Sequence, residues 1–272
     1  MPELPEVETT VRGLRPVLEG QRIARVQTRR GDLRLPFPHD LGQRLTGAVV
    51  TGLRRRAKYG LIDTDRGDTL IFHLGMSGKW RVDPGALGKH DHLVIDTQDG
   101  RTVALNDARR FGFVTLWPSA DLAAYPAFAA MGPEPLGPEL TAPHLDKALA
   151  GRTASIKAML LDQRIVAGLG NIYVCEALFL ARISPKKMAG QISRARLERL
   201  VPAIRAVLEE AIKAGGSSLR DYRQPDGDLG YFSKQFHVYG REGLPCDNGC
   251  GGTVQRYADG GRSTWWCPRC QR

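Results

Sequence analysis

The hydrophobic pattern changes its period partway along the chain, and this change separates two kinds of structure. Between Ile23 and Trp117, short apolar or alternating runs such as 69–72 and 102–105 are separated by Gly, Asp and Pro. Many closely spaced strands without intervening helices favour an antiparallel β-sandwich over a doubly wound parallel sheet. The segment 132–138, rich in Gly and Pro, reads as a linker.

Helical periodicity follows this linker. Residues 197–214 predict an amphipathic helix that ends at Gly215 and Gly216, and 155–161 predict a shorter one. The run 168–171 (Gly-Leu-Gly-Asn) is typical of a tight turn that opens a helix, where backbone N–H groups are able to face a phosphate. The second half of the chain is therefore predicted to be helical.

The N-terminus combines a short helix with a reactive group. Val7, Val11 and Leu14 follow helical spacing, which predicts an amphipathic helix there. Removal of Met1 leaves the secondary amine of Pro2 as the terminus, and an α-amine titrates near pH ~8, so part of it is neutral and nucleophilic at physiological pH. A secondary amine that attacks a sugar C1′ stays a cationic iminium and continues to withdraw electrons. Pro2 is a candidate nucleophile, whereas on residue type alone it is an ordinary processed terminus.

Four of the five cysteines lie in the last 27 residues with the spacing C-x3-C-x16-C-x2-C: Cys246, Cys250, Cys267 and Cys270. Two close pairs on two turns bring four thiolates around one Zn²⁺ with no open position, which indicates a structural site. Free or disulfide-bonded cysteines are the alternative. Cys175 stands in an apolar run and is expected in the core.

The charge balance favours a polyanionic partner. The chain has 39 Lys and Arg against 29 Asp and Glu, a net charge of +10 and a pI near 9.6. A solvated basic surface is the alternative explanation. The sequence contains no apolar run of the ~18 residues that a membrane span needs and no signal peptide, so we expect an intracellular protein.

The whole chain resembles the formamidopyrimidine-DNA glycosylases, bacterial base-excision enzymes that remove oxidised purines and cut the strand. The resemblance rests on seven ordered blocks: 2–9 (PELPEVET), 55–59 (RRAKY), 73–78 (HLGMSG), 89–92 (KHDH), 106–112 (NDARRFG), 168–173 (GLGNIY) and 262–270 (RSTWWCPRC). It implies an α+β multidomain fold. An N-terminal antiparallel β-sandwich with an N-terminal helix is expected at 1–131, a helical helix-two-turn-helix domain at 132–237, and a zinc-bound β-hairpin at 238–272.

The same resemblance implies a bifunctional DNA glycosylase and AP lyase that excises 8-oxoguanine and formamidopyrimidines from duplex DNA. Pro2 then forms a Schiff base at C1′, Glu3 is the general acid/base, and Lys58 assists β-elimination. Arg262 on the zinc hairpin is implicated in δ-elimination. The zinc ion orients Arg262 and takes no part in the chemistry.

DNA contacts are also carried over from the family. An enzyme that flips a base must fill the gap left in the stack, and by resemblance Met76, Arg109 and Phe111 form this wedge. Phosphate contacts are expected from His90, Arg152, Lys157 and Asn171, together with Arg262. On residue type alone, Met76 and Phe111 could equally be core residues instead of wedge residues. His90 could equally cap a strand instead of binding a phosphate.

Two other functions are compatible with parts of the pattern. The endonuclease VIII type shares the start and the scaffold but prefers oxidised pyrimidines; its members usually carry Gly in place of Leu4 and lack the full wedge. A non-catalytic DNA-binding module would need none of Pro2, Glu3 and Lys58.

The region 217–233 is either a lid over the flipped base, acting through Tyr222 and Tyr231, or an ordinary surface loop. We expect a monomer in the bacterial cytoplasm, associated with the nucleoid.

Overall fold

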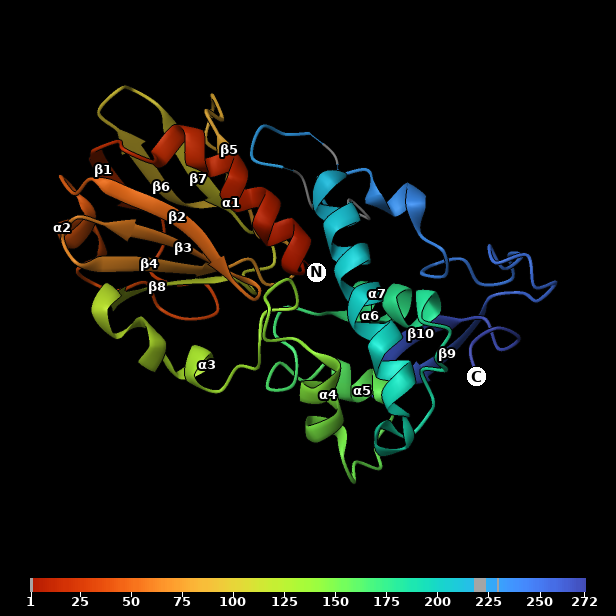
Figure 1. The fold of residues 1–272 in the computed structure, drawn as a ribbon. Coiled ribbons are helices and arrows are strands. Elements are labelled where there is room, and N and C mark those ends of the chain that lie inside the picture. Colours follow the sequence, from red (N-terminus) through yellow and green to blue (C-terminus); the bar gives the residue numbers. More distant parts are fainter. Residues whose placement is uncertain (1, 218–223, 229) are drawn as a thin grey trace. The chain divides into compact units, whose positions relative to one another are not determined.

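The computed structural model describes residues 2–217, 224–228 and 230–272 of the 272-residue chain (Figure 1). The chain divides into two compact units, one of residues 1–129 with 212–233 and one of residues 130–211 with 234–272. Among the described residues, no helix is both long and apolar enough to cross a bilayer. Tyr222, a candidate of the predicted lid, lies outside the described residues.

The first unit contains two antiparallel sheets, as the strand pattern predicted. Within the described residues, one has the order β1 (Ile23–Thr28), β6 (Asp91–Thr97), β7 (Thr102–Asn106), β5 (Lys79–Val82). The other has the order β2 (Val50–Arg56), β3 (Tyr59–Thr64), β4 (Asp68–His73), β8 (Phe113–Pro118). The shorter elements of this unit are α2 (Leu41–Leu45), η1 (Ser119–Ala124) and α3 (Pro126–Ala129). Sequential antiparallel pairing along 50–73 explains why no crossover helices interrupt the strands.

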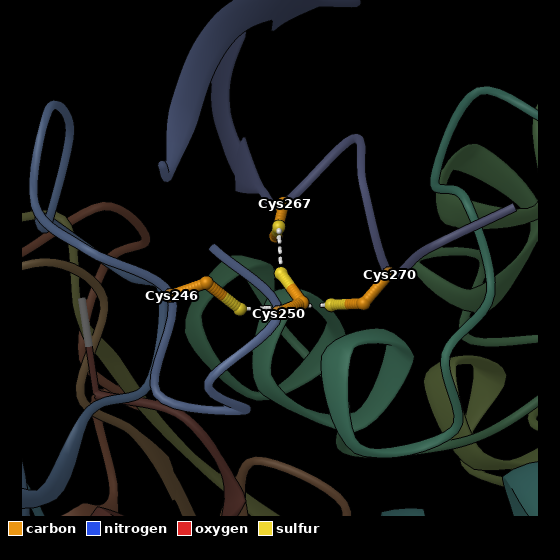
Figure 2. A group of neighbouring side chains, drawn as sticks. All are labelled: Cys246, Cys250, Cys267 and Cys270. Atoms are coloured by element: carbon orange, nitrogen blue, oxygen red, sulfur yellow. Dashed lines mark hydrogen bonds between the residues drawn. The ribbon is translucent and has the colours of Figure 1, made fainter. Parts of the chain in front are cut away.

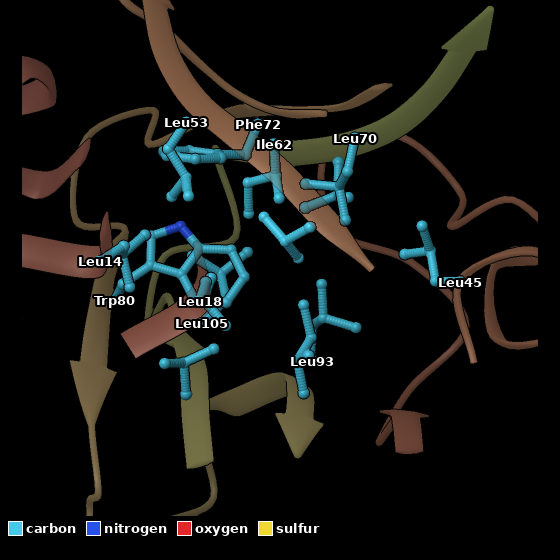
Figure 3. Packing of buried hydrophobic residues seen from close by; sticks show 14 of the residues in the cluster. Leu14, Leu18, Leu45, Leu53, Ile62, Leu70, Phe72, Trp80, Leu93 and Leu105 are labelled. Atoms are coloured by element: carbon cyan, nitrogen blue, oxygen red, sulfur yellow. The ribbon is translucent and has the colours of Figure 1, made fainter. Parts of the chain in front are cut away.

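Helix α1 (Leu4–Leu18) closes the core of this unit. Val7, Val11 and Leu14, the apolar stripe seen in the sequence, are buried together with the inward-facing residues of both sheets. Figure 3 shows Trp80 packed among Leu14, Leu18 and leucines of the sheets. Because α1 is held along its apolar face, its first turn is fixed relative to the sandwich.

The second unit is helical and ends in a hairpin. Its helices are α4 (Ala142–Leu149), α5 (Ile156–Leu160), α6 (Asn171–Leu180), η2 (Ala189–Gln191) and most of α7 (Arg194–Lys213), followed by η3 (Phe232–Gln235) at the boundary of the units. Strands β9 (Gln255–Asp259) and β10 (Arg262–Trp266) pair antiparallel. Gly260 and Gly261 join them with φ values of +54° and +75°, the positive pair that a two-residue hairpin turn requires.

Several local predictions are confirmed in this unit. Helix α6 begins at Asn171 after the glycine turn, and Cys175 is buried within it. The predicted linker 132–138 has no regular structure, but it packs against its own unit. The N–H of Gly132 donates to the carbonyl of Gln163, and the N–H of Ala167 donates to that of Pro133. The segment that is rich in Gly and Pro is therefore irregular, but hydrogen bonds anchor it to its own unit.

Candidate functional site

Pro2 and Glu3 are buried at the start of α1, although they stand at the end of the chain. Glu3 is the N-cap of the helix, and its carboxylate accepts the N–H of Glu6 while the N–H of Glu3 donates to Glu6 Oε2 at 2.8 Å. This reciprocal pair is a capping box, which fixes the backbone of the first helical turn. The residue next to the candidate nucleophile therefore has a fixed backbone and a carboxyl group held at the helix N-terminus.

Lys58 occupies the two-residue turn between β2 and β3, which Ala57 enters with φ of +51°. Its side chain is almost completely buried, and its charge acts on His73 at the end of β4. Burial, reinforced by Lys58 and then Arg34, lowers the pKa of His73 to about 4. Nδ1 of His73 accepts the N–H of Gly75 at 3.1 Å, so the neutral ring carries its proton on Nε2.

His73 was not among the residues that the sequence indicated, although it belongs to the block 73–78. Its nearness to Lys58 arises from pairing of Tyr59 with His73 between β3 and β4. A cation and a neutral imidazole donor side by side are suited to binding an anion, such as a phosphate. The sequence signal was a histidine directly before the predicted wedge loop.

The three predicted wedge residues lie on two touching loops. Met76 is partly exposed in the turn between β4 and β5, and Phe111 is 47% exposed in the loop before β8. The guanidinium of Arg109 lies 4.8 Å from the centre of the Phe111 ring. One exposed and one partly exposed apolar side chain, flanked by a cation, have the composition expected of a group that enters a base stack.

A buried aspartate, Asp107, joins these loops. Its Oδ1 accepts the hydroxyl of Ser77 at 2.5 Å, and its Oδ2 accepts the N–H of Gly112 at 2.8 Å. Ser77 Oγ in turn accepts the N–H of Arg109 at 3.1 Å, and the N–H of Asp107 donates to the carbonyl of His90. The carboxylate of Asp107 thus connects both wedge loops, and its backbone N–H connects them to the segment that carries His90.

A second polar cluster lies in the helical unit. Lys157 is fully buried in α5, and its Nζ has no hydrogen-bond partner among the described residues. Asn171, the first residue of α6, donates from Nδ2 to the carbonyl of Ser263 at 2.8 Å, while its buried Oδ1 makes no hydrogen bond within the described chain. Burial lowers the pKa of Lys157, and the exposed Arg262 on β10 lowers it further. The structure therefore brings Lys157, Asn171 and Arg262 together.

Arg152 stands apart from this cluster. It follows α4, its carbonyl accepts the N–H of Gly190, and its charge helps to lower the pKa of Asp162. Among the described residues its backbone hydrogen-bonds Leu149 and Gly190, and no hydrogen bond joins Arg152 to Lys157 or Asn171. Its exposed side chain is compatible with a DNA contact of its own.

Four cysteines converge at the base of the hairpin (Figure 2). The sulfurs of Cys246, Cys250, Cys267 and Cys270 all lie within 4.8 Å of one another. The N–H of Gly252 lowers the pKa of Cys250 to about 7, so one thiolate is favoured before metal binds. Four converging thiols without a fifth ligand fit a tetrahedral structural zinc site. Gln271 links the site to the helices: its Oε1 accepts the N–H of Cys267, and its Nε2 donates to the carbonyl of Ile183.

Three family descriptions match successive parts of the chain. Residues 1–114 match the formamidopyrimidine-DNA glycosylase N-terminal domain, and residues 131–223 match the formamidopyrimidine-DNA glycosylase H2TH domain. Residues 243–272 match a zinc finger found in FPG and IleRS.

Curated relatives match along the full length. The formamidopyrimidine-DNA glycosylases of Rhizorhabdus wittichii and Novosphingobium aromaticivorans are each 66% identical to the chain over 272 residues, covering 100% of both sequences. The crystal structure of Lactococcus lactis Fpg in complex with DNA containing an abasic site superimposes with a TM-score of 0.92 at 35% identity, covering 100% of both chains. The MutM (Fpg) protein of Thermus thermophilus gives 0.89 at 41% identity, covering 99% of this chain and 98% of that one.

Proposed function

Because the chain belongs to the formamidopyrimidine-DNA glycosylase family, we propose that its base-excision chemistry starts at the amine of Pro2. The enzyme is a DNA glycosylase and AP lyase of base excision repair, and damaged DNA is its partner. One observation supports the assignment above the others: Pro2 and Glu3 are buried at the capped start of α1. A terminus without a role would be solvated and frayed.

The proposed reaction begins when the amine of Pro2 attacks C1′ of the damaged nucleotide. The bond between C1′ and the base breaks, its electron pair leaves with the base, and the base takes up a proton. Opening of the sugar ring leaves an iminium ion between Pro2 and C1′. Removal of a C2′ proton then expels the 3′ phosphate in β-elimination, and a second elimination expels the 5′ phosphate. Hydrolysis of the iminium frees the enzyme.

Two side chains are proposed to move protons in these steps. Glu3 protonates the opening sugar ring and later accepts a proton, which suits a carboxyl group next to the nucleophile. Lys58 acts during β-elimination, where its ammonium group and Nε2–H of His73 together stabilise the departing phosphate. Arg262 is proposed to serve the second elimination as well as phosphate binding.

DNA binding is proposed to divide between two kinds of contact. Met76, Arg109 and Phe111 fill the space of the flipped nucleotide, and Arg109 hydrogen-bonds the base left opposite. Phosphates are held by the remaining basic and amide side chains, which are His90, Arg152, Lys157, Asn171 and Arg262. The buried ammonium of Lys157 supports this, because a phosphate supplies the acceptors that its Nζ lacks among the described residues.

Cys246, Cys250, Cys267 and Cys270 would hold the zinc ion, which would supply no chemistry because four thiolates leave no ligand position for water or substrate. It would fix the hairpin on which Arg262 and Ser263 stand.

We further propose that the chain is divided into three domains, at 1–131, 132–237 and 238–272. We propose that the protein acts as a monomer on oxidised purines, and that it works on nucleoid DNA in the cytoplasm.

The test is borohydride trapping with peptide mapping. A duplex with one 8-oxoguanine opposite cytosine is compared with a thymine-glycol duplex and with an undamaged one. A covalent adduct that maps to Pro2 on the first duplex is the expected result. Trapping on the thymine-glycol duplex alone would show that the enzyme is specific for oxidised pyrimidines. Binding without any adduct would reject catalysis through an amine.

The variant Glu3→Gln separates the proposed proton transfer by Glu3 from the proposed nucleophilic attack by Pro2. It should slow base excision by about 10²–10⁴-fold, the usual contribution of a general acid/base, while a preformed abasic site is still trapped at Pro2. Equal loss of excision and trapping would indicate instead that the substitution displaces the terminus.

A further inference from the structure

The carboxylate of Glu6 connects two segments of the first unit that are 211 positions apart in sequence. Its Oε2 accepts the N–H of Glu3 at 2.8 Å. Its Oε1 accepts both the N–H of Ser217, at 2.8 Å, and the hydroxyl of Ser217, at 2.9 Å. Both residues are buried, so these bonds do not compete with bulk water.

Backbone pairing with a later segment of the same unit also holds Ser217 in place. It forms an isolated antiparallel bridge with Tyr231. The N–H of Tyr231 donates to the carbonyl of Ala214, and the N–H of Phe232 donates to that of Gly216. Ser217 is therefore held between the residues after α7 (214–216) and the segment at 230–232, and Glu6 ties it to the N-terminus.

We infer that Glu6 is a positioning residue that holds the Pro2–Glu3 terminus at the place set by Ser217. This inference rests on the proposed role of Pro2 as nucleophile. Glu6 itself is not placed at a reacting atom; it acts through the backbone of Glu3. When the Ser217 contact is lost, the carboxylate gains freedom to rotate, and the N–H of Glu3 loses its fixed acceptor.

Residue chemistry explains why a carboxylate is required at this position. An ionised Glu offers two oxygens that only accept, whereas the amide of Gln offers one oxygen and an NH₂ group that donates. Three N–H and O–H donors converge on Glu6, so Gln at this position would place two donors against each other on one side. Hydrogen bonds to charged groups are also stronger than neutral ones.

The experiment measures the single-turnover rate of borohydride trapping at Pro2 on a duplex with a preformed abasic site. The variants are Ser217→Ala, Glu6→Gln and the double variant. Thr10→Val is the matched control, because its hydroxyl is also buried on α1 and donates to the backbone carbonyl of Glu6 at 2.8 Å without touching the carboxylate. The dissociation constant for a tetrahydrofuran-containing duplex and the midpoint of thermal unfolding are measured for each protein.

We expect Ser217→Ala to slow trapping about 10-fold, as the loss of one hydrogen bond to a charged group would, with the dissociation constant changed less than about 2-fold. Glu6→Gln should slow it further, and adding Ser217→Ala to Glu6→Gln should have no additional effect. Thr10→Val should trap at the wild-type rate.

Three results on the abasic duplex would overturn the inference. They are wild-type trapping rates for Ser217→Ala, equal slowing by Thr10→Val, and independent effects in the double variant. Slowing of base excision without slowing on the abasic duplex would also overturn it, because Ser217 would then act on the base. If Glu6→Gln does not fold, the trapping rates of Ser217→Ala and Thr10→Val still decide whether the contact between Glu6 and Ser217 positions the terminus. Absence of trapping by the wild-type protein would instead reject the role of Pro2.

Discussion

Gly75 lies against the backbone of Phe111 so closely that a Cβ atom on Gly75 would be 2.3 Å from the carbonyl carbon of Phe111. Gly75 also has φ of +59°, in the left-handed region that favours glycine. These two constraints hold the loop of Met76 against the loop of Arg109 and Phe111, so the wedge behaves as one structural piece.

Gly75→Ala should therefore separate the wedge loops. We expect a loss of about 1–3 kcal/mol in unfolding free energy from the overlap, beyond the strain of the left-handed backbone, and a fall in excision from duplex DNA. Gly85→Ala is the control, because Gly85 has φ of +63° and nothing within 4 Å of its would-be Cβ. Urea unfolding and excision rates measure the two effects. Equal destabilisation by both variants would show that strain alone is responsible.

His73 predicts a loss of stability in mild acid. Its pKa is about 4 in the folded protein against 6.5 in the unfolded chain, so only the unfolded chain takes up the proton as the pH falls through that interval. The difference corresponds to about 3 kcal/mol that is present above pH 6.5 and lost towards pH 4. His73→Gln should flatten this part of the pH dependence in urea unfolding. His39→Gln, at an exposed position, should leave it unchanged.

Lys157 predicts opposite effects on stability and on binding. Replacing its buried ammonium, which makes no hydrogen bond within the described chain, by the apolar Lys157→Met should raise the unfolding free energy by about 1 kcal/mol or more. The same change should weaken DNA binding and reduce the slope of log K against log salt by about 1. The exposed Lys147→Met, which changes the charge equally, should not stabilise. A destabilised Lys157→Met with normal binding would contradict the proposal.

Zinc removal should act mainly through the hairpin. One zinc per chain is expected by metal analysis, and chelation should abolish the order of β9 and β10, since structural zinc contributes on the order of 10 kcal/mol to folding of such sites. DNA affinity should fall because Arg262 and the contact between Ser263 and Asn171 depend on the hairpin. Cys267→Ser should reproduce the effect, and Cys175→Ala should keep the zinc. Retained binding without zinc would reject the role of the hairpin.

The sequence predicted well what local chemistry specifies. The strand pattern before Trp117, the helix ending at Gly215, the start of α6 at Asn171 and the cysteine quartet are all confirmed. Each depends on residues close together in the chain, where periodicity, glycine conformation or ligand spacing sets the outcome. The roles of the individual site residues remain proposals.

Other relationships were invisible in the sequence because they join distant segments. Glu6 and Ser217, or Asp107 and Ser77, carry no local signal, and residues of these types usually face solvent.

The sequence by itself determined most of the helices and strands and the four zinc ligands, since these follow from spacing and from the chemistry of single residues, and it made Pro2 the candidate nucleophile. Only the tertiary structure decided which polar groups are buried together. Burial of His73 beside Lys58, and of Lys157 without a hydrogen-bond partner in the described chain, comes from strand pairing and helix packing. Desolvation depends on everything packed around a group, and that is a property of the fold as a whole.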